Sequence, residues 1–126
     1  MVLDTDMLTV LEEPVFVVPG CEYSTGTGFE GHEYFEAASI RKKDDLYIFV
    51  YSSVVMHELC YAWSRSPLEG FQYGGVLNSN ADIGIDTYKP AEVPAAYGAN
   101  NHGSIVKLGE DWYIFYHRHT LSLIHI

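Results

Sequence analysis

The stretch "SIRKKDDLYIFVYSS" (residues 39–53) returns later in the chain as "SIVKLGEDWYIFYHRH" (residues 104–119). Each copy has Ser-Ile, a polar turn that contains Asp, an apolar or aromatic residue, and then Tyr-Ile-Phe. Branched and aromatic residues on both sides of a polar turn predict a β-hairpin. Because the copies start 65 positions apart, we interpret them as one hairpin in two successive repeat units, with chance similarity of two hairpins as the alternative.

Four strand-like runs surround the first copy. They are separated by short polar or Pro/Gly-containing turns, and they predict an antiparallel meander of four strands at residues 35–42, 46–53, 57–66 and 71–78. A further apolar run between two prolines, Val15 to Val18, predicts an additional strand. Four strands within a long repeat indicate an all-β protein built of β-propeller blades.

Composition narrows the class of protein. The chain has 126 residues, of which 48% are hydrophobic and 14% aromatic, so it is long enough for one small domain with a core. Its formal net charge is -10, which argues against nucleic acid as a partner because phosphate binding needs clustered Lys and Arg. No apolar run is long enough to span a bilayer, and no segment has the pattern of a signal peptide, so the sequence assigns no compartment.

The two cysteines, Cys21 and Cys60, are far apart in the sequence. Neither belongs to a Cys-x-x-Cys pair, which argues against a thiolate zinc site. Whether they form a disulfide with each other cannot be read from their spacing.

Two polar residues occupy similar places in the repeat. Glu36 and His102 each lie just before a matching Ser-Ile. The first strand of each propeller blade lines the central channel, so we expect both side chains to converge on the axis at one face.

The stretches "HEYFEAASIRKKDDLYIFVYSS" (32–53) and "NNHGSIVKLGEDWYIFYHRH" (100–119) resemble glycoside hydrolase family 43. This family comprises five-bladed propeller β-xylosidases, α-L-arabinofuranosidases and arabinanases. The resemblance covers nearly all of residues 2–119 and implies a partial propeller domain at 1–119, with about two and a half blades of four-stranded sheet. Residues 120–126, "TLSLIHI", are expected to be a non-native tail.

The resemblance also implies an inverting mechanism, in which a general base, a general acid and a carboxylate that tunes the acid act together. Glu36 matches the general acid. The usual family triplet is Glu-Gly-Pro, whereas this chain has Glu36-Ala37-Ala38. No segment matches the regions that carry the base and the tuning aspartate, and Asp4 and Asp6 fit neither role. We therefore expect the 126-residue chain alone to be inactive.

Further site residues follow from the resemblance. His102 is expected on the channel axis, where it would reach a calcium ion or a water, although calcium prefers oxygen ligands. The candidate sugar contacts are Arg118, Phe35, His32 and Asn101. Packing between blades is the alternative for Phe35 and His32, a solvated strand end for Arg118, and a backbone turn for Asn101.

The leading functional hypothesis is a glycoside hydrolase that acts on arabinose- or xylose-containing plant polysaccharides or oligosaccharides. The alternative is a carbohydrate-binding or structural propeller without turnover. A related retaining enzyme of fructosides ranks lowest, because the loop before Glu36 lacks the Arg-Asp-Pro stretch that such an enzyme would carry.

Overall fold

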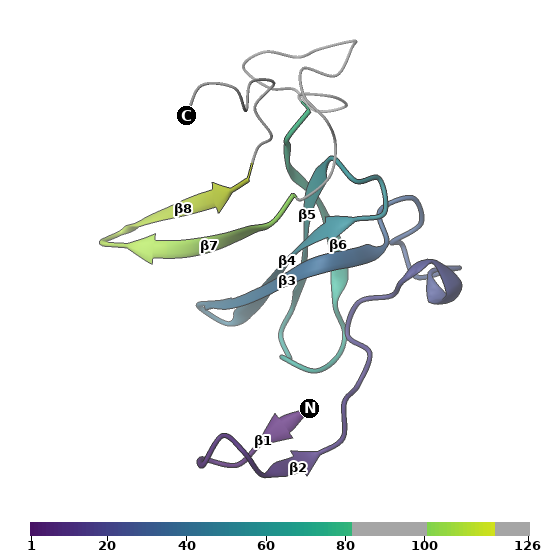
Figure 1. Ribbon diagram of the computed structural model, residues 1–126. Coiled ribbons are helices and arrows are strands. Elements are labelled where there is room, and N and C mark those ends of the chain that lie inside the picture. Colours follow the sequence, from purple (N-terminus) through teal and green to yellow (C-terminus); the bar gives the residue numbers. More distant parts are fainter. Residues whose placement is uncertain (82–100, 118–126) are drawn as a thin grey trace, which may run out of the picture.

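A computed structural model describes residues 1–81 and 101–117, and these residues form three antiparallel sheets (Figure 1). The strands are β1 (Val2–Leu3), β2 (Val10–Glu12), β3 (Tyr34–Lys43), β4 (Leu46–Ser53), β5 (Glu58–Ser64), β6 (Gln72–Ser79), β7 (Gly103–Leu108) and β8 (Asp111–Tyr116). The described residues contain one short 3-10 helix, η1 (Cys21–Tyr23), and no helix that is both long and apolar enough to cross a membrane.

The four central strands form the predicted meander, with the order β3-β4-β5-β6. β4 occupies the predicted range 46–53, and the other three strands lie within two residues of the predicted bounds. The turn between β3 and β4 contains Asp44, whose positive φ of 54° is tolerated by Asp in a tight turn. This sheet is one complete blade.

The core lies on one face of this blade. Phe49, Tyr51, Cys60 and Ala62, from the two inner strands β4 and β5, are buried there together with Val18, Phe29 and Phe71 from the flanking segments. The ring of Phe49 lies 6.0 Å from that of Tyr51 and meets that of Phe71 edge-on at 5.7 Å. Segments before and after the strands therefore close the core of the blade.

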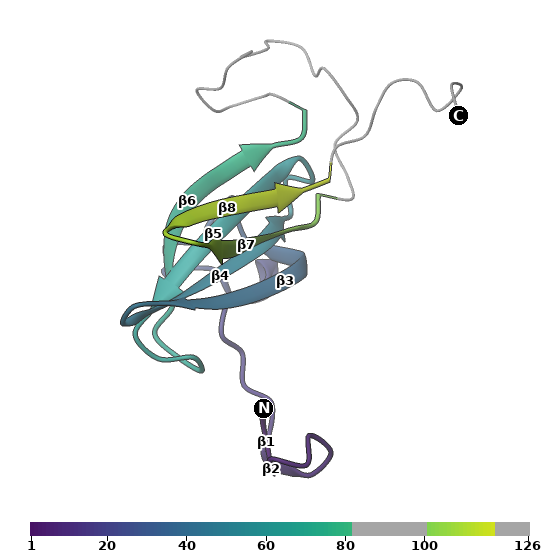
Figure 2. The same cartoon turned by 90° about the vertical axis from the view of Figure 1, so that its left-hand side faces the viewer.

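The second hairpin, β7–β8, lies beside β3 and β4 (Figures 1 and 2). The serines that begin the two sequence repeats face each other, with 2.8 Å between the Oγ atoms of Ser39 and Ser104. At Gly103 the backbone runs so close to β5 that an added Cβ atom would clash with Leu59 Cδ2. The repeat thus corresponds to two adjacent blades, of which the second is represented by β7 and β8, and the fold is part of a propeller.

The strand predicted at Val15 to Val18 is wrong. These residues have no strand pairing, and the nearby strand is β2, which pairs with β1 in a small hairpin that Figure 1 shows below the blade. Val15 and Phe16 are 51% and 89% exposed. Among the described residues, no neighbouring strand pairs with this segment, and a strand needs such a partner for its backbone N–H and C=O groups.

Candidate active site

Glu36 and His102 converge as the repeat predicts. Glu36 lies near the start of β3, and His102 directly precedes β7 in the adjacent blade. Glu36 Oε1 lies 3.4 Å from His102 Nε2, and the two side chains are 40% and 47% exposed. A carboxylate and an imidazole that share a solvent-accessible position can both bind a sugar hydroxyl and exchange a proton with it.

His117, directly after β8, contacts His102 through both its backbone and its side chain. Its backbone N–H donates a 2.9 Å hydrogen bond to the carbonyl of His102. The two imidazole rings are stacked, with centroids 5.5 Å apart and planes 12° from parallel. Ser104, Phe115 and Tyr116 line an open hollow with them. The position of His117 could not be predicted from the sequence alone, because its contact with His102 depends on the pairing of β7 with β8.

The other predicted site residues have different surroundings. Phe35 is 49% exposed beside Glu36. Asn101 is fully buried next to His102, and neither of its side-chain amide atoms has a hydrogen-bond partner. Arg118 lies outside the described residues, as do residues 120–126.

His32 is tied into the blade. Its Nδ1 lies 2.7 Å from Glu58 Oε2, and its ring stacks on Tyr73 with centroids 4.9 Å apart. The same Glu58 oxygen accepts a 3.0 Å hydrogen bond from Ser53 Oγ, and the Tyr51 hydroxyl donates to the backbone carbonyl of His32. These contacts fix the loop that leads into β3. Glu58, at the start of the strand predicted at residues 57–66, was the available signal for this contact and was not among the predicted site residues.

Among the described residues, one cluster has the side chains to hold a metal ion. It consists of His32, Glu58 and Cys60, whose ligand atoms lie within 4.8 Å of one another. Burial, followed by the charge of Glu58, raises the pKa of the Cys60 thiol to about 12. A thiol that keeps its proton is a poor metal ligand, and Glu58 already accepts hydrogen bonds, so the cluster is better explained as an internal network. Both cysteines are free, with Cys21 exposed and Cys60 buried.

The described residues around His102 do not by themselves form a calcium site. They supply the imidazoles of His102 and His117, the Glu36 carboxylate and the buried Asn101 amide, whereas calcium takes about six to eight oxygen ligands.

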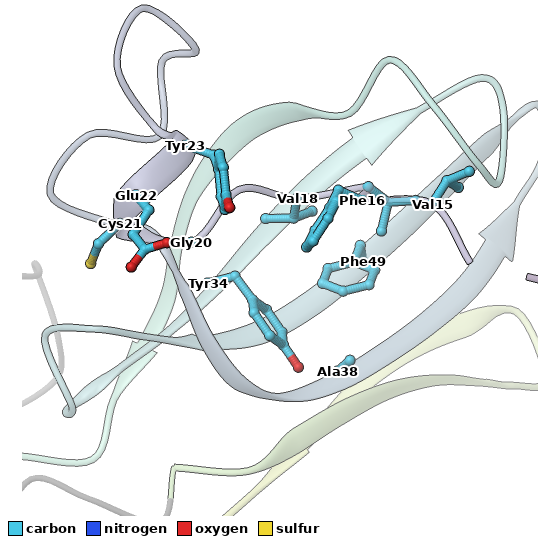
Figure 3. Close-up of a pocket in the computed structure, with 11 residues that line it drawn as sticks. Val15, Phe16, Val18, Gly20, Cys21, Glu22, Tyr23, Tyr34, Ala38 and Phe49 are labelled. Carbon is cyan, nitrogen blue, oxygen red and sulfur yellow. The ribbon is translucent and has the colours of Figure 1, made fainter. Parts of the chain in front are cut away.

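A larger apolar pocket lies elsewhere (Figure 3). It has a volume of about 490 Å³ and is bounded by Phe16, Val18 and Tyr23 on one side and by Tyr34, Ala38 and Phe49 of β3 and β4 on the other. Sugar sites need several polar groups that fix the hydroxyls, and this lining is almost entirely aliphatic and aromatic. We therefore place the candidate active site at Glu36 and His102.

The fold is therefore part of an all-β propeller in which a carboxylate and a histidine meet between adjacent blades. No protein-family model matches the chain. A xylosidase/arabinosidase from Thermoclostridium stercorarium is 69% identical over 119 residues, which are 94% of this chain and 25% of that protein.

Two solved structures support the same relationship. A β-xylosidase named RS223 is 27% identical with a TM-score of 0.63, over 92% of this chain and 32% of that chain. A family 43 β-xylosidase/α-arabinofuranosidase from a compost metagenome, described as a calcium-free form in complex with xylotriose, is 29% identical with a TM-score of 0.61, over 92% and 31%.

The chain belongs to glycoside hydrolase family 43. It spans about a quarter of the length of the curated relative from T. stercorarium and about a third of the two structures.

Proposed function

We propose that this chain is the general-acid segment of an inverting glycoside hydrolase that acts on xylose- or arabinose-containing saccharides. The observation that carries the proposal is the meeting of Glu36 with His102 at 3.4 Å between adjacent blades, in a chain 69% identical to a xylosidase/arabinosidase. Complexes of solved relatives with xylose and xylotriose support a pentose-containing substrate.

In the proposed mechanism Glu36 protonates the glycosidic oxygen of the leaving group, while a second carboxylate activates a water on the opposite face of the sugar. The protonated form of Glu36 must be available at the working pH, and the exposed fraction of its side chain leaves it open to the substrate. His102 lies close enough to orient the carboxyl group of Glu36 through its Nε2 atom. The base and the tuning carboxylate would come from the parts of the relatives' length that this chain does not cover.

The proposed sugar contacts are Phe35, Asn101, His32 and Arg118. Exposure of Phe35 beside Glu36 supports stacking on a sugar face. His32 would act through the edge that its contacts with Glu58 and Tyr73 leave free, since its side chain is 34% exposed. Calcium at His102 remains a prediction that requires oxygen ligands beyond the described residues, so no step of the mechanism passes through a metal.

The test uses a longer chain, of the relatives' length, that contains this segment. We call this longer chain the full-length protein. One source is the T. stercorarium relative with this chain in place of its matching segment. Glu36→Gln is expected to lower kcat on a xylo- or arabino-oligosaccharide by roughly 10²- to 10⁴-fold while binding of the sugar persists.

Glu110→Gln is the matched control, because Glu110 is a 95% exposed carboxylate in the turn between β7 and β8. It is expected to retain full activity. If Glu36→Gln keeps full activity as well, Glu36 is not the general acid, and the non-catalytic carbohydrate-binding propeller becomes the better account.

A further inference from the structure

One residue inside a strand has an unusual backbone. The described residues include four non-glycine residues with a positive φ: Met7, Ala37, Asp44 and Met56. Three of them lie in the connections between strands, where the left-handed conformation reverses the chain. Ala37, with φ of 64°, lies inside β3 and directly follows Glu36. Backbone strain at a non-glycine residue persists only where the surroundings impose it, and it is common at functional sites.

The pairing of β3 with β4 is irregular at the same place. Tyr34 pairs with Ser53, Glu36 with Ser52 and Ser39 with Val50, so β3 advances by five residues while β4 advances by three. From Ser39 to Lys43 the pairing is regular. The two extra residues of β3 therefore form bulges on each side of Glu36, and bulges re-aim side chains in a strand.

This irregularity changes where Glu36 points. In a regular strand, side chains two positions apart face the same side of the sheet. Tyr34 and Ala38 both line the apolar pocket in Figure 3, yet Glu36, which lies between them, reaches His102 in the adjacent blade. Ser39 also faces that blade, through its contact with Ser104. A regular β3 would turn Glu36 toward the apolar pocket.

On the basis of the role proposed for Glu36, we propose that Ala37 is a positioning residue: its left-handed backbone conformation turns the general acid out of the strand register and toward the channel. The side chain of Ala37 is a half-buried methyl group. Because a methyl group has no polar atom, the residue acts through its backbone. The relevant property of the residue is tolerance of a positive φ, which Gly and Asn have and which β-branched residues lack.

This property makes a matched set of variants possible. Val and Asn are similar in size, but only Asn tolerates the left-handed conformation. In the full-length protein, Ala37→Val is expected to lower kcat by roughly 10- to 100-fold with KM little changed, because the acid is misplaced relative to the bound sugar. Ala37→Asn and Ala37→Gly are expected to keep kcat within about threefold of the parent protein.

Met56→Val controls for backbone strain alone. Met56 has φ of 72° in the connection between β4 and β5, and Val there introduces the same conflict without touching Glu36. It is expected to lower the melting temperature to an extent similar to Ala37→Val, while kcat stays at the parent value. A merely structural role for Ala37 would make the two valine variants behave alike in kcat.

Each outcome decides between the proposals. A folded Ala37→Val protein with parental kcat overturns the positioning role, whereas an inactive Glu36→Gln protein in the same series leaves the proposed function intact. If Glu36→Gln is fully active, the proposed function itself falls. Should Ala37→Val not fold, the Gly and Asn variants still decide, because a tenfold loss of kcat in either folded protein contradicts an effect carried by the backbone.

Discussion

The two hairpins β3–β4 and β7–β8 share a sequence motif but differ in burial and in regularity. The Tyr-Ile-Phe run of β4 ends in Phe49, which is 8% exposed, whereas the matching Phe115 of β8 is 58% exposed. Strands β5 and β6 and the flanking segments cover the first hairpin, while β8 has β7 as its strand partner among the described residues. Local sequence therefore forms the hairpin, and neighbouring strands determine how much of it is buried.

The second difference concerns the backbone. The pairing of β7 with β8 runs without a shift from Gly103 to Leu108, whereas β3 is bulged on both sides of Glu36. The regular hairpin presents His102 from just before its first residue, and the bulged hairpin presents Glu36 from within the strand. The irregular pairing that distinguishes the first hairpin from the second therefore lies at the proposed general acid.

The largest expected effect tests the difference in burial. In the 126-residue chain, Phe49→Ala is expected to lower the free energy of unfolding by about 3–5 kcal/mol, because it leaves a cavity in the core. Phe115→Ala is expected to change it by about 0.5 kcal/mol or less, as for an exposed residue. Urea unfolding measures both values. In the full-length protein the cost of Phe115→Ala should rise as further strands cover β8, and an unchanged cost would contradict the propeller arrangement.

The seam between the hairpins provides the next effect. Gly103→Ala would place a methyl group in steric conflict with Leu59 Cδ2 and 2.9 Å from the carbonyl oxygen of Phe115. We expect a loss of roughly 1–3 kcal/mol in the free energy of unfolding from this overpacking. Gly20→Ala is the control, because the nearest atom to its Cβ would lie 3.8 Å away. Equal stability of the two variants would show that β7 does not pack tightly on β5.

A smaller effect is expected at the serine pair that joins the repeats. Ser104→Ala removes the 2.8 Å hydrogen bond to Ser39 and should cost about 0.5–1.5 kcal/mol. A double-mutant cycle with Ser39→Ala isolates the coupling between the two hydroxyl groups. Additive effects of the two substitutions would mean that this contact contributes no interaction energy between the blades.

The smallest effect concerns Glu33, in the loop that leads into the bulged hairpin. Hydrogen bonds from the backbone N–H groups of Glu33 and Gly31, and then from the Ser24 hydroxyl, lower the pKa of Glu33 below the ordinary value of 4.5. A lowered pKa in the folded state adds stability above that ordinary value, and this stability is lost as the pH falls through the folded-state pKa.

Glu33→Gln should therefore be less stable than the parent chain at neutral pH, and the difference should shrink as the pH falls below 4.5. Urea midpoints measured across this pH range provide the test. Glu22→Gln, at an exposed carboxylate in the same loop, is the control for the loss of one surface charge. A pH-independent effect of Glu33→Gln would contradict the role of its charge.

Much of the fold could be predicted from the sequence. The repeat identified both hairpins, and their turn chemistry placed β4 correctly. The strand expected at Val15 to Val18 was wrong because propensity cannot supply a pairing partner, and this segment has none. The bulges at Glu36 could not be predicted, because they depend on the register between β3 and β4 and not on local composition.

The candidate site was predicted in part. The equivalent positions of Glu36 and His102 in the repeat were sufficient to predict that the two side chains meet. The contact of His32 with Glu58 was not predicted, since it joins residues 26 positions apart through the closing of the blade. The roles of Arg118 and the other sugar contacts remain predictions.

The central claim is that Glu36 donates a proton to the leaving group, and its most direct test is the dependence of kcat on that group. Full-length Glu36→Gln protein should hydrolyse aryl glycosides with poor leaving groups roughly 10²- to 10⁴-fold more slowly than the parent protein. With an activated leaving group such as 2,4-dinitrophenolate, which departs without protonation, the loss should largely disappear. An equal loss of kcat for both kinds of substrate would contradict the assignment of Glu36 as the general acid.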